Sequence, residues 1–334
     1  VTVVILGDGL ASTAVGPLEV FFAAGMLFPT LKGETPNQLF DVTTVSLDGK
    51  SVSAAYGLGL TPQKSIEDIE RTDIIIVPTS GIEVDLKLIE NSALLPWLRK
   101  HHALGAYIAG TCMGSVYLAE AGLLDGREAT THWAATQDFE RRYPKVKWRP
   151  DLLITEDSRL LCSGGVTSAI DVSLYLVEKL ISHDIAVQTA KALLHPMPRI
   201  NQSGYAVLPL SPPHEDARIR EVESYIQKNF RTDLGIESLA EKFGMSGRTF
   251  LRRFKAATGR LPGAYVQAVR VEVAKSMLER DRASVQTIAS HVGYEDVSFF
   301  RTLFKRLTGM TPGDYRSHFG KYSIRKADAP DAST

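Results

Sequence analysis

Short apolar runs alternate with helix-length amphipathic segments through the first 195 residues of the chain. This alternation is typical of a parallel sheet covered by helices on both faces, so it predicts an α/β sandwich. The predicted strands are residues 2–6, 40–46, 73–77, 104–109, 152–155 and 159–162. The predicted helices are residues 17–27, 93–101, 115–121, 132–142 and 169–181.

The helical pattern stops at "PMPRINQSGYAVLPLSPPH", residues 196–214, which contains five prolines. We interpret residues 196–216 as a linker, or as an extended strap over the first domain. The pattern is then almost wholly helical over residues 217–319, which predicts an all-α second domain. The tail, residues 320–334, is small and polar, which predicts disorder. The chain is therefore expected to have two domains, 1–195 and 217–319.

The second domain contains an internal repeat. "LAEKFGMSGRTFLRRFKAATGRLPGAY" (239–265) matches "IASHVGYEDVSFFRTLFKRLTGMTPGDY" (288–315), at an offset of 49 before the central turn and 50 after it. Each copy has a short helix, a Gly, a polar turn with an N-cap candidate (Ser246 or Asp296), and a second amphipathic helix. This pattern predicts two helix-turn-helix units in tandem.

The second helix of each copy presents polar and basic side chains. An α-helix fits the major groove of DNA, where Arg bonds guanine bidentately and Ser or Thr bonds several bases. Two such helices about one DNA turn, ~34 Å, apart could read successive grooves, with the remaining basic residues against phosphates. The alternative is a helical bundle with a solvated basic face, and the tandem arrangement argues against it. The predicted DNA-binding residues are Ser246, Arg248, Thr249, Arg252, Arg253, Lys255, Ser298, Arg301, Thr302, Lys305 and Arg306.

Residues 217–319 resemble the AraC-type DNA-binding domain. "RVEVAKSMLERD" is similar to the helix that connects the two copies, and "VGYEDVSFFRTLFKRLTGMTPGDYR" to the signature stretch of that domain. The resemblance implies that Arg248 and Arg252 read bases in one copy, and Ser298 with Arg301 or Thr302 in the other. It also implies double-stranded promoter DNA and RNA polymerase as partners.

Charge and cysteine content refine this division of roles. The formal net charge is +0, but residues 1–214 carry 17 Lys and Arg against 23 Asp and Glu, whereas residues 215–326 carry 21 against 13. An acidic half joined to a basic half suggests that one handles a small molecule and the other a polyanion. Two cysteines are too few for a disulfide framework and point to a reducing compartment. No apolar stretch approaches the ~18 residues of a membrane span, and "VTVVILGDG" is typical of a first strand rather than a signal peptide, so we expect a cytoplasmic protein without a membrane partner.

A turn with candidate chemistry follows one predicted strand. In "GTCMG", residues 110–114, Cys112 stands between a buried strand and a predicted helix, which is the setting of a nucleophile elbow. An elbow raises its side chain above the sheet, and the N–H of Met113 points into the same space. A helix N-terminus there lowers the pKa of a thiol and attracts anions. We expect three other segments at neighbouring strand ends, the usual ligand crevice of such sheets: "GPLEVF" with Glu19, "PTSGIE" with Gly81 and "TTHW" with His132.

This arrangement resembles the PfpI-like branch of the class I glutamine amidotransferase superfamily, which has a flavodoxin-like fold. The similar stretches are "GPLEVF", "GTCMGSVYLAEAGLLDGREATTHW" and "CSGGVTSAIDVSLYLVEKL". The resemblance implies a nucleophilic Cys112, an acidic contact from Glu19, and backbone donors near Gly81 and Met113. Proteases of the branch place a histidine where this chain has Met113, and no His-x-Glu pair of the amidotransferase kind follows the elbow. Isonitrile hydratases of the branch share the elbow and the "ATTHW" pattern.

Several roles for Cys112 stay open on the residues alone. It could be a nucleophile, a contact in a noncatalytic ligand pocket, or a buried structural residue, and oxidation sensing with Cys162 is a further option. His132 is the only candidate base, and its place at a helix start suits a cap or a ligand donor equally. We interpret the elbow as the floor of an effector pocket and expect no enzymatic activity. The predicted ligand-binding residues are Glu19, Gly81, Thr111, Cys112, Met113 and His132.

A PfpI-like domain followed by an AraC-type domain resembles the GlxA-type subgroup of AraC-family regulators. The resemblance implies a ligand-responsive transcriptional regulator, most often an activator, that senses a small nitrogenous metabolite such as an amino acid or a quaternary amine. It implies a homodimer formed through the first domain. The alternative is a cysteine-dependent hydratase or hydrolase, similar to isonitrile hydratases, fused to a DNA-binding domain. No residue pattern predicts a cofactor or metal. The adjacent His101 and His102 are not interpreted as metal ligands, because they lie at the end of a predicted helix, where cations are favoured.

Overall fold

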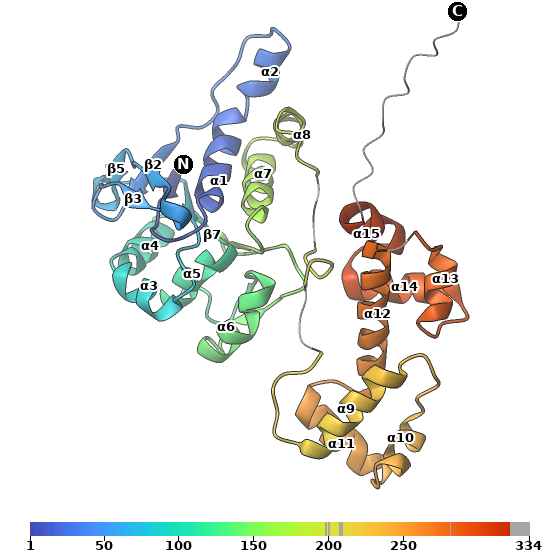
Figure 1. Ribbon diagram of the computed structural model, residues 1–334. Coiled ribbons are helices and arrows are strands. Elements are labelled where there is room, and N and C mark those ends of the chain that lie inside the picture. The colour runs from blue at the N-terminus through green and yellow to red at the C-terminus, as the bar shows by residue number, and fades with distance from the viewer. Residues whose placement is uncertain (198, 200, 207–209, 281, 321–334) are drawn as a thin grey trace, which may run out of the picture. The chain divides into compact units, whose positions relative to one another are not determined.

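Figure 1 shows a computed structural model of the chain, which describes residues 1–197, 199, 201–206, 210–280 and 282–320. The chain forms two compact units, of which the first spans Val1–Ala206. We call them the N-terminal and C-terminal units and treat each by itself. The tail that was predicted to be disordered lies outside the described residues, except for Gly320.

The N-terminal unit is built on a seven-stranded sheet with the order β10-β11-β7-β6-β1-β2-β5. Neighbouring strands are parallel except β10 and β11, which form a hairpin. Ser158 and Arg159 both have positive φ, as a two-residue turn between right-twisted strands requires. The strands are β1 (Thr2–Val4), β2 (Thr43–Ser46), β5 (Lys64–Ser65), β6 (Ile74–Val77), β7 (Tyr107–Thr111), β10 (Ile154–Asp157) and β11 (Leu160–Ser163). Two small sheets pair β3 (Val52–Ser53) with β4 (Gly59–Leu60) and β8 (Glu128–Ala129) with β9 (Lys147–Trp148).

Helices cover both faces of this sheet, which confirms the predicted α/β sandwich. Side chains alternate along β6: Ile74 and Ile76 pack into one hydrophobic layer, and Ile75 and Val77 into the other. Figure 1 shows α1 and α7 side by side in the first layer. The helices are α1 (Ser12–Ala23), α2 (Leu27–Leu31), α3 (Val84–Glu90), α4 (Leu94–Ala103), α5 (Ser115–Glu120), α6 (Thr136–Arg142), α7 (Ser168–Leu180) and α8 (His183–Ala192).

Some element boundaries differ from the prediction. Helix α1 begins five residues before Pro17, which lies inside the helix rather than at its start. Strand β7 begins at Tyr107 instead of residue 104, because α4 continues to Ala103 and Gly105, with a φ of 95°, then turns the chain. Helices α2, α3 and α8 were not predicted, nor were the two-residue strands, because such short or polar segments carry too few periodic apolar positions.

We call residues 195–206 the strap; its described residues, 195–197, 199 and 201–206, belong to the N-terminal unit and form no helix. Asn201 pairs with Leu152 in an isolated antiparallel bridge. The Arg199 guanidinium binds the buried carboxylate of Asp171 through two nitrogens. Of the two interpretations of the proline-rich segment, the extended strap therefore describes its first part.

The last part of the proline-rich segment contacts the C-terminal unit instead. Glu223, which is buried on α9 (Ala217–Asn229), accepts a hydrogen bond from the hydroxyl of Ser211. Its other carboxylate oxygen lies 2.9 Å from Nε2 of His214. Each end of the segment is thus anchored, and each to a different unit.

In the described part of the C-terminal unit, residues 210–280 and 282–320, all regular secondary structure is helical, as predicted. Its longest helix, α12 (Pro262–Arg280), contacts helices that precede it and helices that follow it. No helix among the described residues is both long and apolar enough to cross a lipid bilayer. The other helices are α9, α10 (Ile236–Lys242), α11 (Gly247–Thr258), α13 (Val285–His291), α14 (Val297–Thr308) and α15 (Pro312–Phe319).

The predicted internal repeat is confirmed in the structure. Helices α10 and α11, which we call repeat 1, correspond to α13 and α14, which we call repeat 2, at the offsets seen in the sequence. The cores repeat as well, since the ring centroids of Phe254 and Tyr265 lie 5.4 Å apart and those of Phe304 and Tyr315 lie 5.5 Å apart. Gly259 ends α11 with a φ of 73°, and a glycine ends α14 in the same way.

Candidate functional site

The predicted elbow is present at the carboxyl end of β7. Cys112 has a φ of 55°, in the left-handed region that a non-glycine residue rarely adopts. The turn is tight because a Cβ at Gly110 would lie 2.7 Å from the Cα of Ser115, and a Cβ at Gly114 would lie 2.3 Å from the carbonyl oxygen of Val77. The two glycines of "GTCMG" therefore let the turn close against its own helix and against β6.

A methyl group at Gly114 tests this packing. We expect Gly114→Ala to lower the free energy of unfolding of the N-terminal unit by about 1–3 kcal/mol, since the added Cβ would meet two backbone carbonyls. Gly59→Ala is the matched control, because a Cβ there meets nothing within 4 Å. Urea denaturation of both variants measures the difference. Equal stabilities would contradict the close approach of the elbow to β6.

The Cys112 thiol is buried and protonated. Only 5% of the residue is exposed, and burial raises the pKa of its thiol to about 11, although the Met113 N–H that bonds it opposes the shift. The carbonyl of Cys112 accepts bonds from the hydroxyls of Thr131 (3.0 Å) and Ser115 (3.3 Å), which hold the turn in place. Burial likewise raises the pKa of Cys162 to about 12. Both cysteines thus lack the lowered pKa that nucleophilic and redox-sensing thiols need.

Alkylation kinetics test this state of Cys112. At pH 8 a thiol with a pKa of about 11 is ionised in roughly one molecule in a thousand. In the Cys162→Ser variant, we expect iodoacetamide to react with Cys112 far more slowly than with free cysteine. The rate should rise about tenfold per pH unit between 7 and 9. A fast, pH-independent reaction near pH 7 would show instead that the thiolate is stabilised.

Thr111 ties the elbow to α1. Pro17 has no N–H, so it leaves the carbonyl of Thr13, four residues earlier in the helix, without its usual donor. The hydroxyl of Thr111 lies 3.3 Å from this carbonyl oxygen and donates to it. The proline of "GPLEVF" thus gives α1 a polar contact with the elbow.

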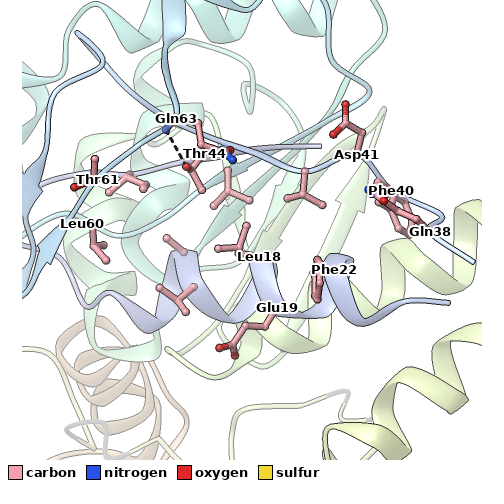
Figure 2. A pocket seen from close by; sticks show the side chains of 15 residues that line it. Leu18, Glu19, Phe22, Gln38, Phe40, Asp41, Thr44, Leu60, Thr61 and Gln63 are labelled. Atoms are coloured by element: carbon pink, nitrogen blue, oxygen red, sulfur yellow. Dashed lines mark hydrogen bonds between the residues drawn. The ribbon is translucent and has the colours of Figure 1, made fainter. Parts of the chain in front are cut away.

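Glu19, in contrast, does not join the elbow. It is exposed and lines a hollow of about 630 Å³ between α1 and residues 38–44, which Cys112 does not line. Figure 2 shows the Leu18 and Phe22 side chains facing this hollow, while Glu19 leaves α1 on the side away from Asp41. The acidic contact that the resemblance implied for Cys112 is therefore absent from Glu19, because this residue lies on another face of the helix.

Gly81 lies in the loop after β6, beside a cluster of charges. A Cβ at Gly81 would come within 3.2 Å of the side chains of Asp8 and Lys87. The Lys87 ammonium binds the carboxylate of Asp8 and lies 2.6 Å from that of Glu90. Carboxylates raise the pKa of Lys87, so this lysine stays charged and joins α3 to the loop that holds Asp8.

His132, the candidate base, lies beside a cavity, and its ring is hydrogen-bonded to a backbone N–H. Its Nδ1 accepts a hydrogen bond from the Ala134 N–H at 3.1 Å and so caps a short helical turn, Trp133–Ala135. Burial lowers the pKa of the ring, so the imidazole is neutral and carries its proton on Nε2. A cavity of about 190 Å³ adjoins it. Its lining residues are His132, Trp133, Leu153, Gly165, Val166, Thr167, Ser168, Arg199, Gln202 and Tyr205.

Three of these lining residues belong to the strap and were not predicted as site residues. Arg199, Gln202 and Tyr205 follow a proline-rich stretch without apolar periodicity. The only signal in the sequence was the concentration of polar side chains in "RINQSGY", and that signal is shared by ordinary loops. The structure thus shows that the strap lines part of the cavity beside His132.

In repeat 1, the predicted DNA-binding residues have three different settings. Arg248, Arg252 and Lys255 are exposed on α11. Arg253 instead binds the carboxylate of Asp216 through two nitrogens, at 2.7 and 3.0 Å, and so joins α11 to the start of α9. The other two form the helix cap, because the Ser246 hydroxyl accepts the Thr249 N–H and bonds the Thr249 hydroxyl.

In repeat 2, Asp296 caps α14 through the N–H groups of its first turn. Ser298, Arg301 and Lys305 are exposed on this helix. The Thr302 hydroxyl donates to the carbonyl of Ser298 at 3.0 Å, and Arg306 donates to the side chain of Gln267 on α12 at 3.2 Å. Both repeats therefore expose a polar and basic face on the second helix.

Comparison with known proteins supports this division. The sequence profile of the DJ-1/PfpI family matches residues 16–179, and that of a helix-turn-helix domain matches residues 239–318. The transcriptional regulator CdhR of Pseudomonas aeruginosa is 28% identical over 82% of this chain and 80% of its own length. The isonitrile hydratase of Pseudomonas putida is 35% identical, over 40% of this chain and 57% of its own length. A crystal structure of a Vibrio parahaemolyticus protein shares the fold over 57% of this chain and 97% of its own, with 20% identity and a TM-score of 0.50.

The fold and the exposed helices define a two-domain DNA-binding protein, with a DJ-1/PfpI-type α/β unit before a tandem helix-turn-helix unit. The two profile matches, together with the similarity to CdhR, show that this chain shares the domain arrangement of AraC-type transcriptional regulators with a PfpI-like N-terminal domain. The resemblance found in the sequence is thereby confirmed.

Proposed function

We propose that the protein regulates transcription in response to a small nitrogenous metabolite, which its N-terminal unit binds. The observation that carries this proposal is the repeat itself: two helix-turn-helix elements of equal length, whose second helices both end at a left-handed glycine, each expose a basic second helix. A ligand changes DNA binding only if it binds two arrangements of the protein unequally. The strap, which lines a cavity and continues toward the C-terminal unit, is the segment where we expect that difference to arise.

The finer parts of this proposal concern partners. We propose that the protein is a homodimer through its N-terminal unit, binds double-stranded promoter DNA in the cytoplasm, and acts as an activator by recruiting RNA polymerase. The basic residues exposed on α11 and α14 support the DNA part. Sedimentation of the isolated chain and reporter expression with and without the protein test the dimer and the activation separately.

The experiment that tests the proposed function has two stages. Duplexes that the protein selects from a random pool identify its operator, and a fluorescent operator then reports binding in the presence of metabolite pools. We expect at least one fraction to change the apparent dissociation constant. If no fraction of a metabolite extract changes it while DNA binding is intact, the protein is a DNA-binding protein without this ligand response.

A cysteine-dependent hydratase is the second candidate function, and the similarity to isonitrile hydratase favours it. A buried thiol with a raised pKa and a neutral histidine that caps a helical turn argue against it. We therefore propose that the protein is not an enzyme.

Replacement of the cysteine separates the two functions. We expect Cys112→Ser to preserve the response of DNA binding to effector and expect the wild type to show no hydration of isonitriles or hydrolysis of small amides. Turnover by the wild type that the serine variant loses would establish the enzyme instead.

A further inference from the structure

Gln202 is a strap residue whose side chain is buried in the N-terminal unit. It is 2% exposed, and its Nε2 donates to the carbonyls of Thr131 (2.9 Å) and Leu152 (3.1 Å) and lies 3.0 Å from the hydroxyl of Thr130. Two carbonyl partners fix which end of the amide is nitrogen, because a carbonyl accepts and never donates. The position of Oε1 follows from these contacts.

Oε1 of Gln202 is a buried acceptor without a donor among the described residues. A Cβ added at Gly164 would lie only 2.5 Å from it, so this glycine leaves the space that the amide oxygen occupies. Buried amide oxygens nearly always accept a hydrogen bond, so an acceptor left open beside a cavity calls for an explanation. The cavity that Gln202 helps to line is the one that adjoins His132.

The remaining wall of this cavity offers complementary groups. His132 carries a proton on Nε2, since Nδ1 accepts from Ala134, and the imidazole faces Gly165. Trp133, Leu153 and Val166 add apolar surface. A small molecule with an acceptor at one end and an N–H or O–H donor at the other would satisfy His132 and Gln202 together.

We propose that this cavity is a ligand site for a small molecule that donates a hydrogen bond to Oε1 of Gln202, with α-amino acids and primary amides as the chemical class. A quaternary ammonium compound has no N–H and cannot make this bond. Because Oε1 is not reached by solvent in this structure, the ligand's donor meets it only when the strap shifts. Ligand binding therefore changes the position of the strap. The inference rests on the proposed function only where it concerns DNA binding.

Matched ligands and variants test the site on the full chain. The probes are the standard L-amino acids and acetamide, with glycine betaine and N,N-dimethylacetamide as counterparts that lack N–H. Calorimetry and thermal unfolding report binding, because a ligand of the folded state raises the unfolding temperature. The rate of trypsin cleavage after Arg199 reports how far the strap has moved from its position in this structure. We expect at least one N–H compound to bind, and to accelerate this cleavage, while both counterparts fail.

Two substitutions locate the bound compound. Gly165→Ala adds a methyl group to the cavity at an ordinary 3.5 Å from the His132 ring, so the fold is preserved, and we expect at least a tenfold loss of affinity. Gln202→Met keeps the volume but removes the acceptor together with the Nε2 donor that bonds Thr131 and Leu152, and we expect a similar loss. Ser203→Ala, in the same strap but outside the cavity lining, is the control and should bind normally.

The outcomes separate the site from the regulatory function. Betaines binding as tightly as amino acids, affinity unchanged by Gly165→Ala and Gln202→Met, or no binding by any N–H probe would each overturn the proposed site, while a response of DNA binding to other metabolites could still be observed. Binding that both variants lose, together with unchanged operator affinity, would support the site and reject its regulatory role.

Discussion

Replacing Arg248 and Arg252 together with alanine is expected to abolish operator recognition by repeat 1. Both side chains are exposed, and they are one helical turn apart on α11. A bidentate Arg–guanine contact contributes about 1–3 kcal/mol, so the double variant should bind its operator roughly 2–6 kcal/mol more weakly, which is on the order of 30- to 10,000-fold. Fluorescence anisotropy on an operator selected by the wild type measures the loss of affinity. Repeating the measurement at several salt concentrations gives the salt slope of DNA binding.

The appropriate control is another exposed arginine outside the basic helices. Arg141→Ala removes a side chain that is 78% exposed on α6 of the N-terminal unit, and it should leave operator affinity unchanged. Arg253→Ala is not a suitable control, because Arg253 holds the start of α9 through Asp216. If the double variant binds the operator with the wild-type affinity and the wild-type salt slope, α11 does not read DNA.

The second large effect is expected in the core of repeat 2. Phe304 is fully buried, and its ring packs against Phe300 and Tyr315 at centroid distances of 5.8 and 5.5 Å. Phe304→Ala should lower the free energy of unfolding by about 3–5 kcal/mol, through lost burial and the cavity that remains. Because repeat 1 has its own core, we expect hydrogen exchange to accelerate mainly in α13–α15.

A second phenylalanine on the same helix provides the comparison. Phe299 is 48% exposed, and its ring lies 5.7 Å from that of Tyr294, so Phe299→Ala should cost less than about 1 kcal/mol. Equal losses of protection in α10 and α11 of the Phe304→Ala variant would show that the two cores unfold as one cooperative body. That result would contradict two independent repeats.

The predictions from sequence succeeded where residues repeat a pattern. The offset between the repeats placed both helix-turn-helix elements, since apolar periodicity and glycine caps are local signals. The predicted start of the first helix, at Pro17, was less accurate. A proline usually marks a helix start, but here the carbonyl that it leaves free is bonded by Thr111, a residue 98 positions from Thr13 in the chain. Such a compensating contact is set by tertiary structure and leaves no local trace.

The candidate site was only partly predictable for the same reason. The elbow follows from "GTCMG" and its flanking strand, and the structure confirms its form. The direction in which Glu19 points depends on how α1 is rotated against the sheet, and this tertiary packing is not encoded in the "GPLEVF" motif itself. The roles of Arg199 and Gln202 depend on contacts with residues far away in sequence, so polar composition alone could not distinguish them from ordinary loop residues.

The anchoring of the proline-rich segment at both ends limits the span between the attachments. With the strap held up to Ala206 and the other end held from Leu210, the intervening chain can extend at most roughly 14 Å. If the strap were detached back to the end of α8 at Ala192, the chain up to Leu210 could extend to about 60 Å. Under the proposed strap shift, ligand binding beside Gln202 would therefore lengthen the chain that is free between the two attachments. In a dimer, that length would decide which separations between two operator half-sites the protein can occupy at once.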